Sequence, residues 1–560
     1  MVGFSAIISC DRGSGDALPA KIVGKGWNMT DPKVSRRAFM GTSAAIGAAA
    51  GFGSLAAYGA EATVQEGDVW DIGELDEPTE TMDVDLCIVG AGGCGVAAAL
   101  QAKQIGVENL LVIEKQDVTG GSFIGTEGMF AVGSHWQKEA GETATSAEII
   151  QECMTYHHWQ PEYDLYRTFF DKTADTIDWL EENGVEFDHV QALGNSHTCW
   201  HIYKGSNHPG VEFMASLTKA ATDAGVTFET GLSGKKLLLG DNGEVKGLLA
   251  QRKDGTVVEI DAPAVIVATG GYANNTELTS TLTGKPADFF NPAGTEGRDG
   301  DGIKMARDAG AALTRFPGTL QVTGPVCRGS KWGDDIAAIC LQPTLWINQK
   351  GERYIGENMS IKNFTFAGTA MLNQDRVFVI ESQAQIDRFT SGDGLYVNVG
   401  VYALAGQTLP DLPDEIEELV EKGTVYVADT VAELAEKIGV DPAALGATVE
   451  KYNGYCDTGV DEDFFKDAEM LCAIPESDGP YYAFDCQDNY PTTCGGIRIT
   501  PTTEALDGSG NVIAGLYVGG VDAGGFYGDA YDVGIAAGST AAWAINSGRM
   551  AAEQVARYLA

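Results

Sequence analysis

The pattern of apolar and polar positions predicts a strand–helix–strand unit that begins near residue 84. An apolar run, Val84-Asp85-Leu86-Cys87-Ile88-Val89, predicts a buried strand. A glycine-rich loop follows, and the alanine-rich segment from Val96 to Ile105 predicts a helix. A second apolar run, Asn109–Ile113, predicts the next strand, which ends at Glu114. This order is typical of two parallel strands joined by a helical crossover.

Further apolar runs extend this pattern along the chain. Apolar residues at helical spacing predict a helix from Tyr163 to Leu180. Strands are predicted at Val226–Glu229, Gly247–Ala250 and Ala264–Ala268. Near the C-terminus, Gly515–Val518 predicts another strand, which a glycine loop and a closing helix follow.

Between residues 317 and 485 the alternation of strands and helices changes. Charged helices mix there with short strands and loops, and the helices are predicted at Asp414–Glu421, Val431–Lys437 and Pro442–Tyr452. We expect residues 317–485 to form a separate α+β domain that is inserted into the first domain. The first domain would then consist of residues 83–316 and 486–560.

The N-terminal residues are typical of an export signal. Ser35-Arg36-Arg37-Ala38-Phe39-Met40 resembles a twin-arginine motif, and a mildly apolar run from Ala44 to Ala57 follows it. This run is too short and too weakly apolar to span a bilayer stably. We expect residues 1–62 to be a leader with its true start at Met29, and residues 63–82 to be an acidic linker. Export by this route predicts a periplasmic or cell-surface protein whose mature chain has no stable membrane span.

Composition narrows the classes of function. A chain of 560 residues, 44% of them hydrophobic, is long enough for two cores. The formal net charge of -42 disfavours binding to nucleic acid and anionic lipid. It keeps the protein soluble, and an acidic docking face for a basic redox partner is the alternative interpretation. None of the 11 cysteines forms a CxxC or CxxCH motif, so no metal site and no attached haem are expected.

The loop after the first strand predicts a dinucleotide site. In Gly90-Ala91-Gly92-Gly93-Cys94-Gly95, the first glycine allows a tight turn and Gly92 lets the backbone approach a pyrophosphate. Gly95 lets helix and strand pack closely, and the helix N-terminus supplies N–H groups to the phosphates. Glu114, at the end of the second strand, is placed to accept hydrogen bonds from ribose hydroxyls. Strand, loop, helix, strand and acid in this order make the motif specific.

Four motifs in order resemble one flavoprotein family. Thr119-Gly120-Gly121-Ser122, Ala268-Thr269-Gly270-Gly271, Gly515-Leu516-Tyr517-Val518-Gly519-Gly520 and Val533-Gly534-Ile535-Ala536-Ala537 are similar to the FAD-binding family of fumarate reductase and succinate dehydrogenase flavoproteins, urocanate reductase and 3-ketosteroid dehydrogenases. Gly351-Glu352-Arg353-Tyr354 in the inserted domain is also typical of this family. The resemblance implies an α/β fold in which a discontinuous Rossmann-type FAD-binding domain carries an inserted α+β capping domain.

The resemblance also implies which residues hold FAD. The cofactor-binding residues it implies are Gly90, Gly92, Gly93, Gly95, Glu114, Lys115, Gly120, Gly121, Ser122, Thr269, Gly270, Asp522, Gly534, Ile535 and Ala536.

The substrate site departs from that of the fumarate reductases. Those enzymes clamp carboxylates with histidine and arginine residues, whereas this chain has Thr493 and Cys494 before Gly495-Gly496 and Tyr531 where they have an arginine. All seven histidines lie between His135 and His208. A dicarboxylate without these partners would have poorly compensated charge. We therefore do not expect fumarate or succinate to be the substrate.

The C-terminal loop resembles that of 3-ketosteroid dehydrogenases. Gly528-Asp529-Ala530-Tyr531 implies that the Tyr531 hydroxyl and the Ile535 N–H hold a substrate carbonyl, with Lys362 or an unassigned acid as proton donor. This predicts an exported FAD-dependent oxidoreductase that reduces an activated C=C bond, of enone type and steroid-like. Hydride would come from flavin N5, and electrons from a separate cytochrome or membrane quinol oxidoreductase, as in anaerobic respiration.

Two other functions remain as hypotheses. The first is a reductase of an unsaturated carboxylate of fumarate, urocanate or cinnamate type, for which Arg298, Arg328 and Lys331 are the candidate partners. The second is an electron-transfer subunit without alkene chemistry. Some other residues have both a structural and a functional interpretation: His157, His158, His201 and Lys204 near a flavin or metal, and Trp332 and Trp346 in an apolar pocket.

Overall fold

The predicted strand–helix–strand unit lies at the centre of a six-stranded sheet. The strand order is β18-β19-β11-β2-β3-β7. All neighbours are parallel except β18 and β19. The strands are β2 (Leu86–Val89), β3 (Leu110–Glu114), β7 (Thr227–Thr230), β11 (Ala264–Val267), β18 (Glu504–Leu506) and β19 (Val512–Val518). Strands β11 and β19, which pair Val265 with Leu516, thus share one sheet although they are far apart in the chain, and the sheet confirms the predicted α/β class.

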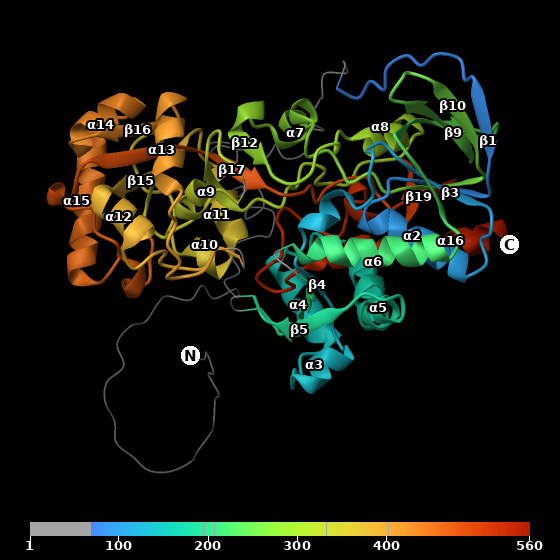
Figure 1. Cartoon of the computed structure of the whole chain (residues 1–560), viewed down its shortest axis with the longest axis horizontal. Coiled ribbons are helices and arrows are strands. Elements are labelled where there is room, and N and C mark those ends of the chain that lie inside the picture. The colour runs from blue at the N-terminus through green and yellow to red at the C-terminus, as the bar shows by residue number, and fades with distance from the viewer. Residues whose placement is uncertain (1–68, 194–195, 206–207, 332, 401–402) are drawn as a thin grey trace, which may run out of the picture. The chain divides into compact units, whose positions relative to one another are not determined.

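Three long helices pack together beside this sheet. Helix α2 (Gly93–Gln104) packs against both α6 (Pro209–Asp223) and α16 (Ser539–Leu559), and α6 lies in front of the other two in Figure 1. The predicted first helix begins three residues earlier than the alanine run, because the glycines of the loop already take helical conformation from Gly93. Residues Val96 to Ala99 on α2 are fully buried, which explains the small side chains there.

Two smaller sheets complete the first domain. One has the order β1-β10-β9-β8 and the other β4-β6-β5. Their strands are β1 (Glu80–Asp83), β4 (Gly128–Phe130), β5 (Phe187–Gln191), β6 (Trp200–Tyr203), β8 (Leu232–Leu239), β9 (Val245–Arg252) and β10 (Val257–Asp261). Helices α3 (His135–Glu139), α4 (Ser146–Tyr156), α5 (Tyr163–Glu182), α7 (Thr276–Thr283) and α8 (Asp301–Asp308) lie in the connections.

A separate sheet forms the core of the cap. Strand β17 (Tyr481–Tyr490) pairs with β12, β13, β15 and β16, and β14 pairs with β15. These strands are β12 (Phe290–Pro292), β13 (Gly324–Cys327), β14 (Leu345–Asn348), β15 (Val377–Ser382) and β16 (Val425–Ala428). The sheet therefore takes strands from both sides of the predicted boundaries at residues 317 and 485, which stay predictions.

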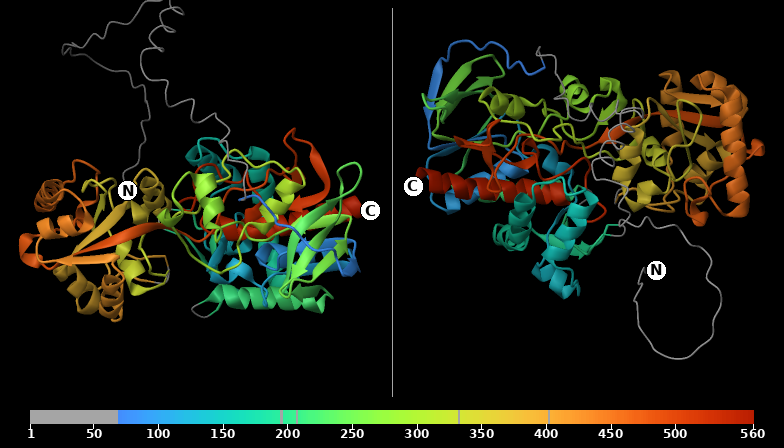
Figure 2. Two further views of the ribbon diagram at one scale, coloured as in Figure 1. Left: turned by 90° about the horizontal axis from the view of Figure 1, so that it is seen from above. Right: turned by 180° about the vertical axis from the view of Figure 1, so that it is seen from behind.

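The helices of the cap surround this sheet. They are α9 (Asp335–Cys340), α10 (Met359–Lys362), α11 (Phe364–Met371), α12 (Gln383–Ser391), α13 (Leu412–Glu421), α14 (Val431–Ile438) and α15 (Pro442–Thr458). Helix α15 is nearly two turns longer than its predicted segment, and ends at Gly459 in the left-handed conformation. In both views of Figure 2 the orange cap elements are well separated from the blue and red elements of the first domain.

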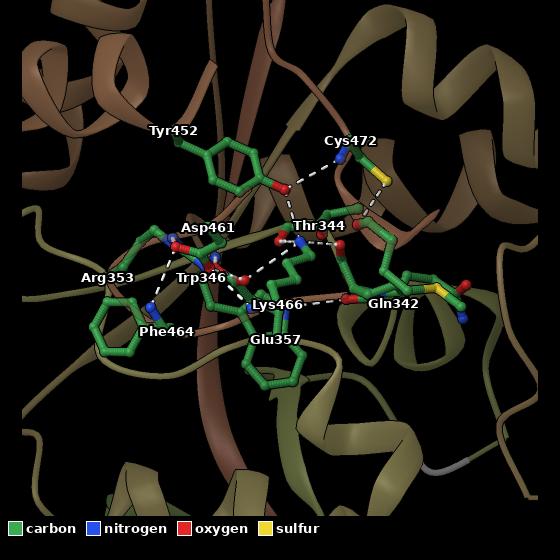
Figure 3. A network of polar contacts seen from close by, with 12 residues as sticks. Gln342, Thr344, Trp346, Arg353, Glu357, Tyr452, Asp461, Phe464, Lys466 and Cys472 are labelled. Atoms are coloured by element: carbon green, nitrogen blue, oxygen red, sulfur yellow. Dashed lines mark hydrogen bonds and ion pairs between the residues drawn. The ribbon is translucent and has the colours of Figure 1, made fainter. Parts of the chain in front are cut away.

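A buried charge network ties the strand ends of the cap to the segment that carries α10 (Figure 3). Arg353 forms bidentate hydrogen bonds with Glu357 and with Asp461, at 2.8–3.1 Å. Lys466 donates to the Tyr452 hydroxyl at 2.6 Å, and its ammonium lies 3.3 Å from Glu357. The Arg353 and Lys466 side chains are at most 4% exposed, so this segment is fixed from within the cap.

This computed structural model describes residues 69–193, 196–205, 208–331, 333–400 and 403–560. The predicted leader, the twin-arginine motif, the start at Met29, residues 63–68 of the acidic linker and Trp332 lie outside these residues. Among the helices in the described ranges, none combines the length and the hydropathy needed to cross a bilayer.

Candidate active site

One cavity of about 440 Å³ is lined by both domains. The first domain contributes the glycine loop, Glu114 and the loop before α16. The cap contributes Leu341, Ile361 and Phe364. Most of the lining is apolar. An apolar cavity with a few polar groups at a domain junction is the usual form of a cofactor and substrate site.

Two helices begin at this cavity without side-chain caps. Helix α2 follows Gly92 and α16 follows Gly538, and neither N-terminus is closed by a side-chain hydrogen bond. Residues of both first turns line the cavity. Free N–H groups and the positive end of the helix dipole favour negatively charged ligand groups there.

The glycines of the first loop have the geometry that a dinucleotide needs. A side chain at Gly90 would overlap the Ala268 carbonyl, and one at Gly95 would overlap the Gly90 carbonyl. A Cβ at Gly92 would meet only the Gly120 carbonyl, at 3.9 Å, so this position is open. Loop, strand and helix thus approach closely, while the backbone at Gly92 stays accessible to a pyrophosphate.

Glu114 and Lys115 lie at one end of the cavity. The Glu114 carboxylate accepts hydrogen bonds from the N–H groups of Ala91 and Gln116, both at 2.8 Å, and also lines the cavity. The Lys115 ammonium lies 2.8 Å from Asp299 and 2.7 Å from Asp301. The glycine cradle, the two helix ends and this carboxylate together fit the phosphates and ribose of FAD.

The predicted cofactor residues differ in whether they line the cavity. Those that line the cavity are Gly90, Gly92, Gly93, Glu114, Lys115, Gly121, Ser122, Thr269 and Gly270. Asp522 instead lies behind the loop: it is fully buried, and its carboxylate accepts hydrogen bonds from Thr269, Gly270 and Gly271. Asp522 therefore shapes the cofactor loop, and direct FAD contact by Asp522 stays a prediction.

Tyr531 lines the cavity and is 2% exposed. Burial and the nearby Asp532 carboxylate raise its pKa, and hydrogen bonds with Thr540 and Ser539 only partly offset this. Tyr531 therefore stays a neutral hydrogen-bond donor at physiological pH. The Ile535 N–H donates to the Asp532 carbonyl at 2.9 Å, so in this conformation a substrate oxygen would have to replace that bond.

A buried polar cluster supports the Tyr531 loop from behind. The Asp532 carboxylate accepts hydrogen bonds from the Tyr166 hydroxyl and the Ser539 hydroxyl, both at 2.8 Å. His157 Nε2 lies 3.4 Å from the same carboxylate, and both side chains are at most 1% exposed. The Tyr156 hydroxyl donates to the Tyr531 carbonyl at 3.0 Å. No sequence spacing could have paired His157 with a residue 375 positions away.

Lys362 and part of the C-terminal motif lie outside the cavity lining. The Lys362 ammonium is 2.9 Å from Asp467, and both side chains are about two-fifths exposed. Gly534 packs against Asn363 of the cap, where a Cβ would lie 3.0 Å from Asn363 Nδ2. A role for Lys362 as proton donor would thus need another conformation, and this role stays a prediction.

The candidate carboxylate partners are already bound to other groups or lie elsewhere. Arg298 lines the cavity, but its guanidinium donates to Asn274 and to the carbonyls of Thr295, Pro491 and Ala293. Arg328 pairs with Asp288 and Asp485, and neither Arg328 nor Lys331 lines the cavity. Among the described residues that line the cavity, the cations are Arg298, which is fixed by neutral oxygens, and Lys115, which is paired with aspartates.

The remaining residues considered from the sequence have structural surroundings. His201 Nε2 bonds to Ser134 at 2.7 Å, and burial lowers the pKa of His201 to about 4. Lys204 pairs with Glu186 at the surface. Trp346 is fully buried in the cap and donates to the Gln342 carbonyl at 3.2 Å. Glu127, which the sequence reasoning did not single out, does line the cavity.

Fold and site together define a flavin-dependent oxidoreductase with a two-segment dinucleotide domain and a cap. Residues 85–534 match the family model described as "FAD binding domain", and the chain belongs to this family. The chain is 34% identical over 483 residues to the vinyl phenol reductase of Lactiplantibacillus plantarum, which covers 85% of this chain and 96% of that protein.

Solved structures agree with this assignment. The open conformation of a flavocytochrome c3 fumarate reductase matches with a TM-score of 0.65 and 25% identity, over 88% of this chain and 83% of that one. The 3-ketosteroid-Δ4-(5α)-dehydrogenase from Rhodococcus jostii RHA1 shares the fold, with a TM-score of 0.62, 23% identity, and 86% and 98% coverage. The predicted family and FAD as cofactor are confirmed. The chain is an FAD-dependent oxidoreductase that acts on CH–CH or C=C bonds.

Proposed function

We propose that this enzyme reduces the C=C bond of a neutral, apolar alkene conjugated to an oxygen-bearing group. Vinyl phenols and enones, including polycyclic and steroid-like enones, belong to this class. The proposal rests on the contacts that the two cations lining the cavity already make with protein oxygens. Arg298 is held in place by hydrogen bonds to neutral protein oxygens and Lys115 is paired with two aspartates, so a substrate carboxylate would have to share or replace contacts that these cations already make.

Tyr531 supplies the polar contact that such a substrate needs. A neutral hydroxyl can donate to an enone carbonyl and stabilise the negative charge that develops there, and it can orient a phenolic oxygen by a hydrogen bond. The Tyr531 loop is held by the Asp532 cluster, so this donor is positioned before substrate binds. The cap contributes the apolar side chains of Leu341, Ile361 and Phe364, which would contact the apolar part of the substrate.

The first domain provides the cofactor site. The glycine loop and the two helix ends hold the phosphates and ring system of FAD, and Glu114 binds the ribose. When bound and reduced, FAD supplies a hydride to the electron-poor alkene carbon. The vinyl phenol reductase that is 34% identical to this chain is named for a vinyl phenol, which is a neutral alkene.

A flavin reoxidation screen tests the proposal. The purified holoprotein is reduced anaerobically with a dye, and alkenes are added one at a time while flavin absorbance is followed. We expect fast reoxidation by 4-vinylphenol or by cyclic enones, and slow reoxidation by fumarate, urocanate and cinnamate. Reoxidation by fumarate alone would refute the proposal.

Tyr531→Phe is the matched variant for this screen. It removes the donor and keeps the ring, so we expect the reoxidation rate to fall by roughly 10²–10³-fold. FAD content should stay unchanged, because the ring packing of Tyr531 against Tyr527 remains. An unchanged rate would remove Tyr531 from the mechanism.

We also propose export by the twin-arginine route and electron supply by a separate cytochrome or membrane quinol oxidoreductase. The support is the Arg36-Arg37 motif with its apolar run, and the absence of a CxxCH motif from the sequence. Fractionation of a producing cell, with and without Arg36→Lys and Arg37→Lys together, tests export. Retention of both forms in the same compartment would refute it.

A further inference from the structure

We propose that Glu127 is the acid that protonates the alkene carbon which does not receive the hydride. This inference rests on the proposed function, and it concerns the same cavity. It supplies the proton donor that alkene reduction requires and that Lys362, in the conformation seen here, does not provide.

Glu127 lines the cavity beside β4, the strand that is bonded to the loop before α16. It connects η1 (Gly121–Gly125) to β4, and the end of β4 is bonded to the loop before α16 through Phe130 N–H and the Gly538 carbonyl, at 3.1 Å. Trp200 lies between the two glycines: a Cβ at Gly128 would be 2.7 Å from its Nε1, and one at Gly538 would be 2.8 Å from its Cδ1.

The part of the cavity lining that contains Glu127 is distinct from the part that we assign to the nucleotide. Glu127, Trp200, Gly538, Thr540 and Tyr531 all line the same cavity, and Tyr531 is hydrogen-bonded to Thr540. Glu114 and Lys115 line its other end, at the carboxyl end of β3. Glu127 therefore belongs to the end at which a substrate oxygen would meet Tyr531.

The Glu127 carboxyl group has no hydrogen-bond or ion-pair partner among the residues that the structure describes. The other acids that line the cavity have different surroundings. Glu114 accepts two backbone hydrogen bonds, Asp301 pairs with Lys115 and Lys235, and Glu296 is exposed. A half-buried carboxyl group that faces an apolar cavity without a partner favours its neutral, proton-carrying form.

Burial raises the pKa of Glu127 to about 7, and no charged neighbour contributes to this shift. The titratable groups on the elements packed around it are His201 and Tyr203 on β6, Glu212 on α6, and Tyr531. His201, whose pKa is lowered to about 4, is neutral near pH 7, and burial keeps Tyr203 protonated. The acid form of Glu127 is therefore present below pH about 7 and is lost as the pH rises above it.

The proposed step balances. The O–H bond of Glu127 breaks, and its proton forms the new C–H bond at one alkene carbon. The hydride from reduced FAD forms the C–H bond at the other carbon, so the C=C π bond is consumed and FAD is left oxidised. Glu127 remains as a carboxylate and takes up a proton from solvent before the next turnover. Tyr531 keeps its own proton and serves as hydrogen-bond donor throughout.

Glu127→Gln tests the proposal, with Glu127→Asp as the conservative variant and Glu139→Gln, at an exposed carboxyl of α3, as the control. Anaerobic reoxidation of the reduced holoprotein by 4-vinylphenol or by a cyclic enone is followed by stopped flow from pH 5.5 to 9. Loss of a general acid lowers such a rate by roughly 10²–10⁴-fold. We expect that loss for Glu127→Gln, a smaller loss for Glu127→Asp, and a wild-type rate for the control.

The pH profile and the infrared spectrum separate chemistry from structure. The wild-type rate should fall above pH about 7, and the residual rate of Glu127→Gln should not depend on pH in this range. The C=O band of a protonated carboxylic acid should disappear from the wild-type holoprotein around the same pH, and be absent from Glu127→Gln at equal FAD content. An unchanged rate, an unchanged profile or a missing wild-type band would overturn the assignment. A wild-type enzyme that no neutral alkene reoxidises would refute the proposed function itself, and with it this role.

Discussion

Replacement of Arg353 by Met should destabilise the cap strongly. The Arg353 side chain is 4% exposed and forms four hydrogen bonds of 2.8–3.1 Å to two carboxylates that are themselves 0% exposed. Methionine keeps much of the volume between Tyr452 and Phe464, so packing changes little. The cost comes from leaving Asp461 without its cation and Glu357 with Lys466 alone, and breaking such a buried pair costs about 3–5 kcal/mol.

The result is measurable as a shift in thermal unfolding. For a unit of 150–250 residues, 1 kcal/mol shifts Tm by roughly 2–4 °C, so the cap transition should fall by roughly 6–20 °C in calorimetry. Arg167→Met removes a surface pair with Asp171 whose side chains are about half exposed, and should leave Tm unchanged. A Tm for Arg353→Met within 2 °C of the wild type would show that the network is dispensable, and would refute the reasoning.

Three further outcomes are expected. Gly95→Ala places a Cβ against the Gly90 carbonyl, so the protein should lose its FAD on purification while far-ultraviolet circular dichroism stays close to wild type; a full FAD content would contradict the close approach. Asp532→Asn keeps one acceptor oxygen, sets an amide donor against either the Tyr166 or the Ser539 hydroxyl and removes the negative charge, so it should lower both Tm and the reoxidation rate. Tyr166→Phe, which removes one donor only, should be milder, and equal effects would contradict the anchoring role of the carboxylate. Burial tends to raise the pKa of Asp461, but the hydrogen bonds and charge of Arg353 hold it below its usual value. The stability that depends on this depressed pKa is present above pH about 4 and is lost as the pH falls further, so the acid-induced fall in Tm should be shallower in Arg353→Met than in wild type.

The cofactor domain was predictable because its physics is local. A run of apolar residues makes a buried strand, and only glycine fits at Gly90 and Gly95, where another side chain would overlap a carbonyl. The acid at Glu114 ends the strand that pairs with β2. The strand, the contact at Gly95 and Glu114 lie within 30 residues, so the sequence displays them directly, whereas the carbonyl that restricts Gly90 belongs to Ala268. The family resemblance added the second segment, in which β19 pairs with β11.

The substrate side required the tertiary structure. Whether Arg298 is free depends on carbonyls at Ala293, Thr295 and Pro491, and no sequence pattern shows which oxygens a guanidinium will meet. The pairing of His157 with Asp532 depends on how α4 packs beside the loop before α16.

Glu127 is another residue whose chemistry depends on the tertiary structure. Its sequence context, Thr126-Glu127-Gly128, is that of an ordinary loop acid. Burial decides its chemistry, because a carboxyl group without partners in an apolar cavity holds its proton to a higher pH. The sequence by itself determined the dinucleotide-binding fold, since this depends on glycines and apolar runs in fixed order, and its resemblance to a flavoprotein family added the cofactor and the class of reaction. The tertiary structure decided which charged groups are already paired and which one is left to react, because pairing depends on distance in space and not on separation along the chain.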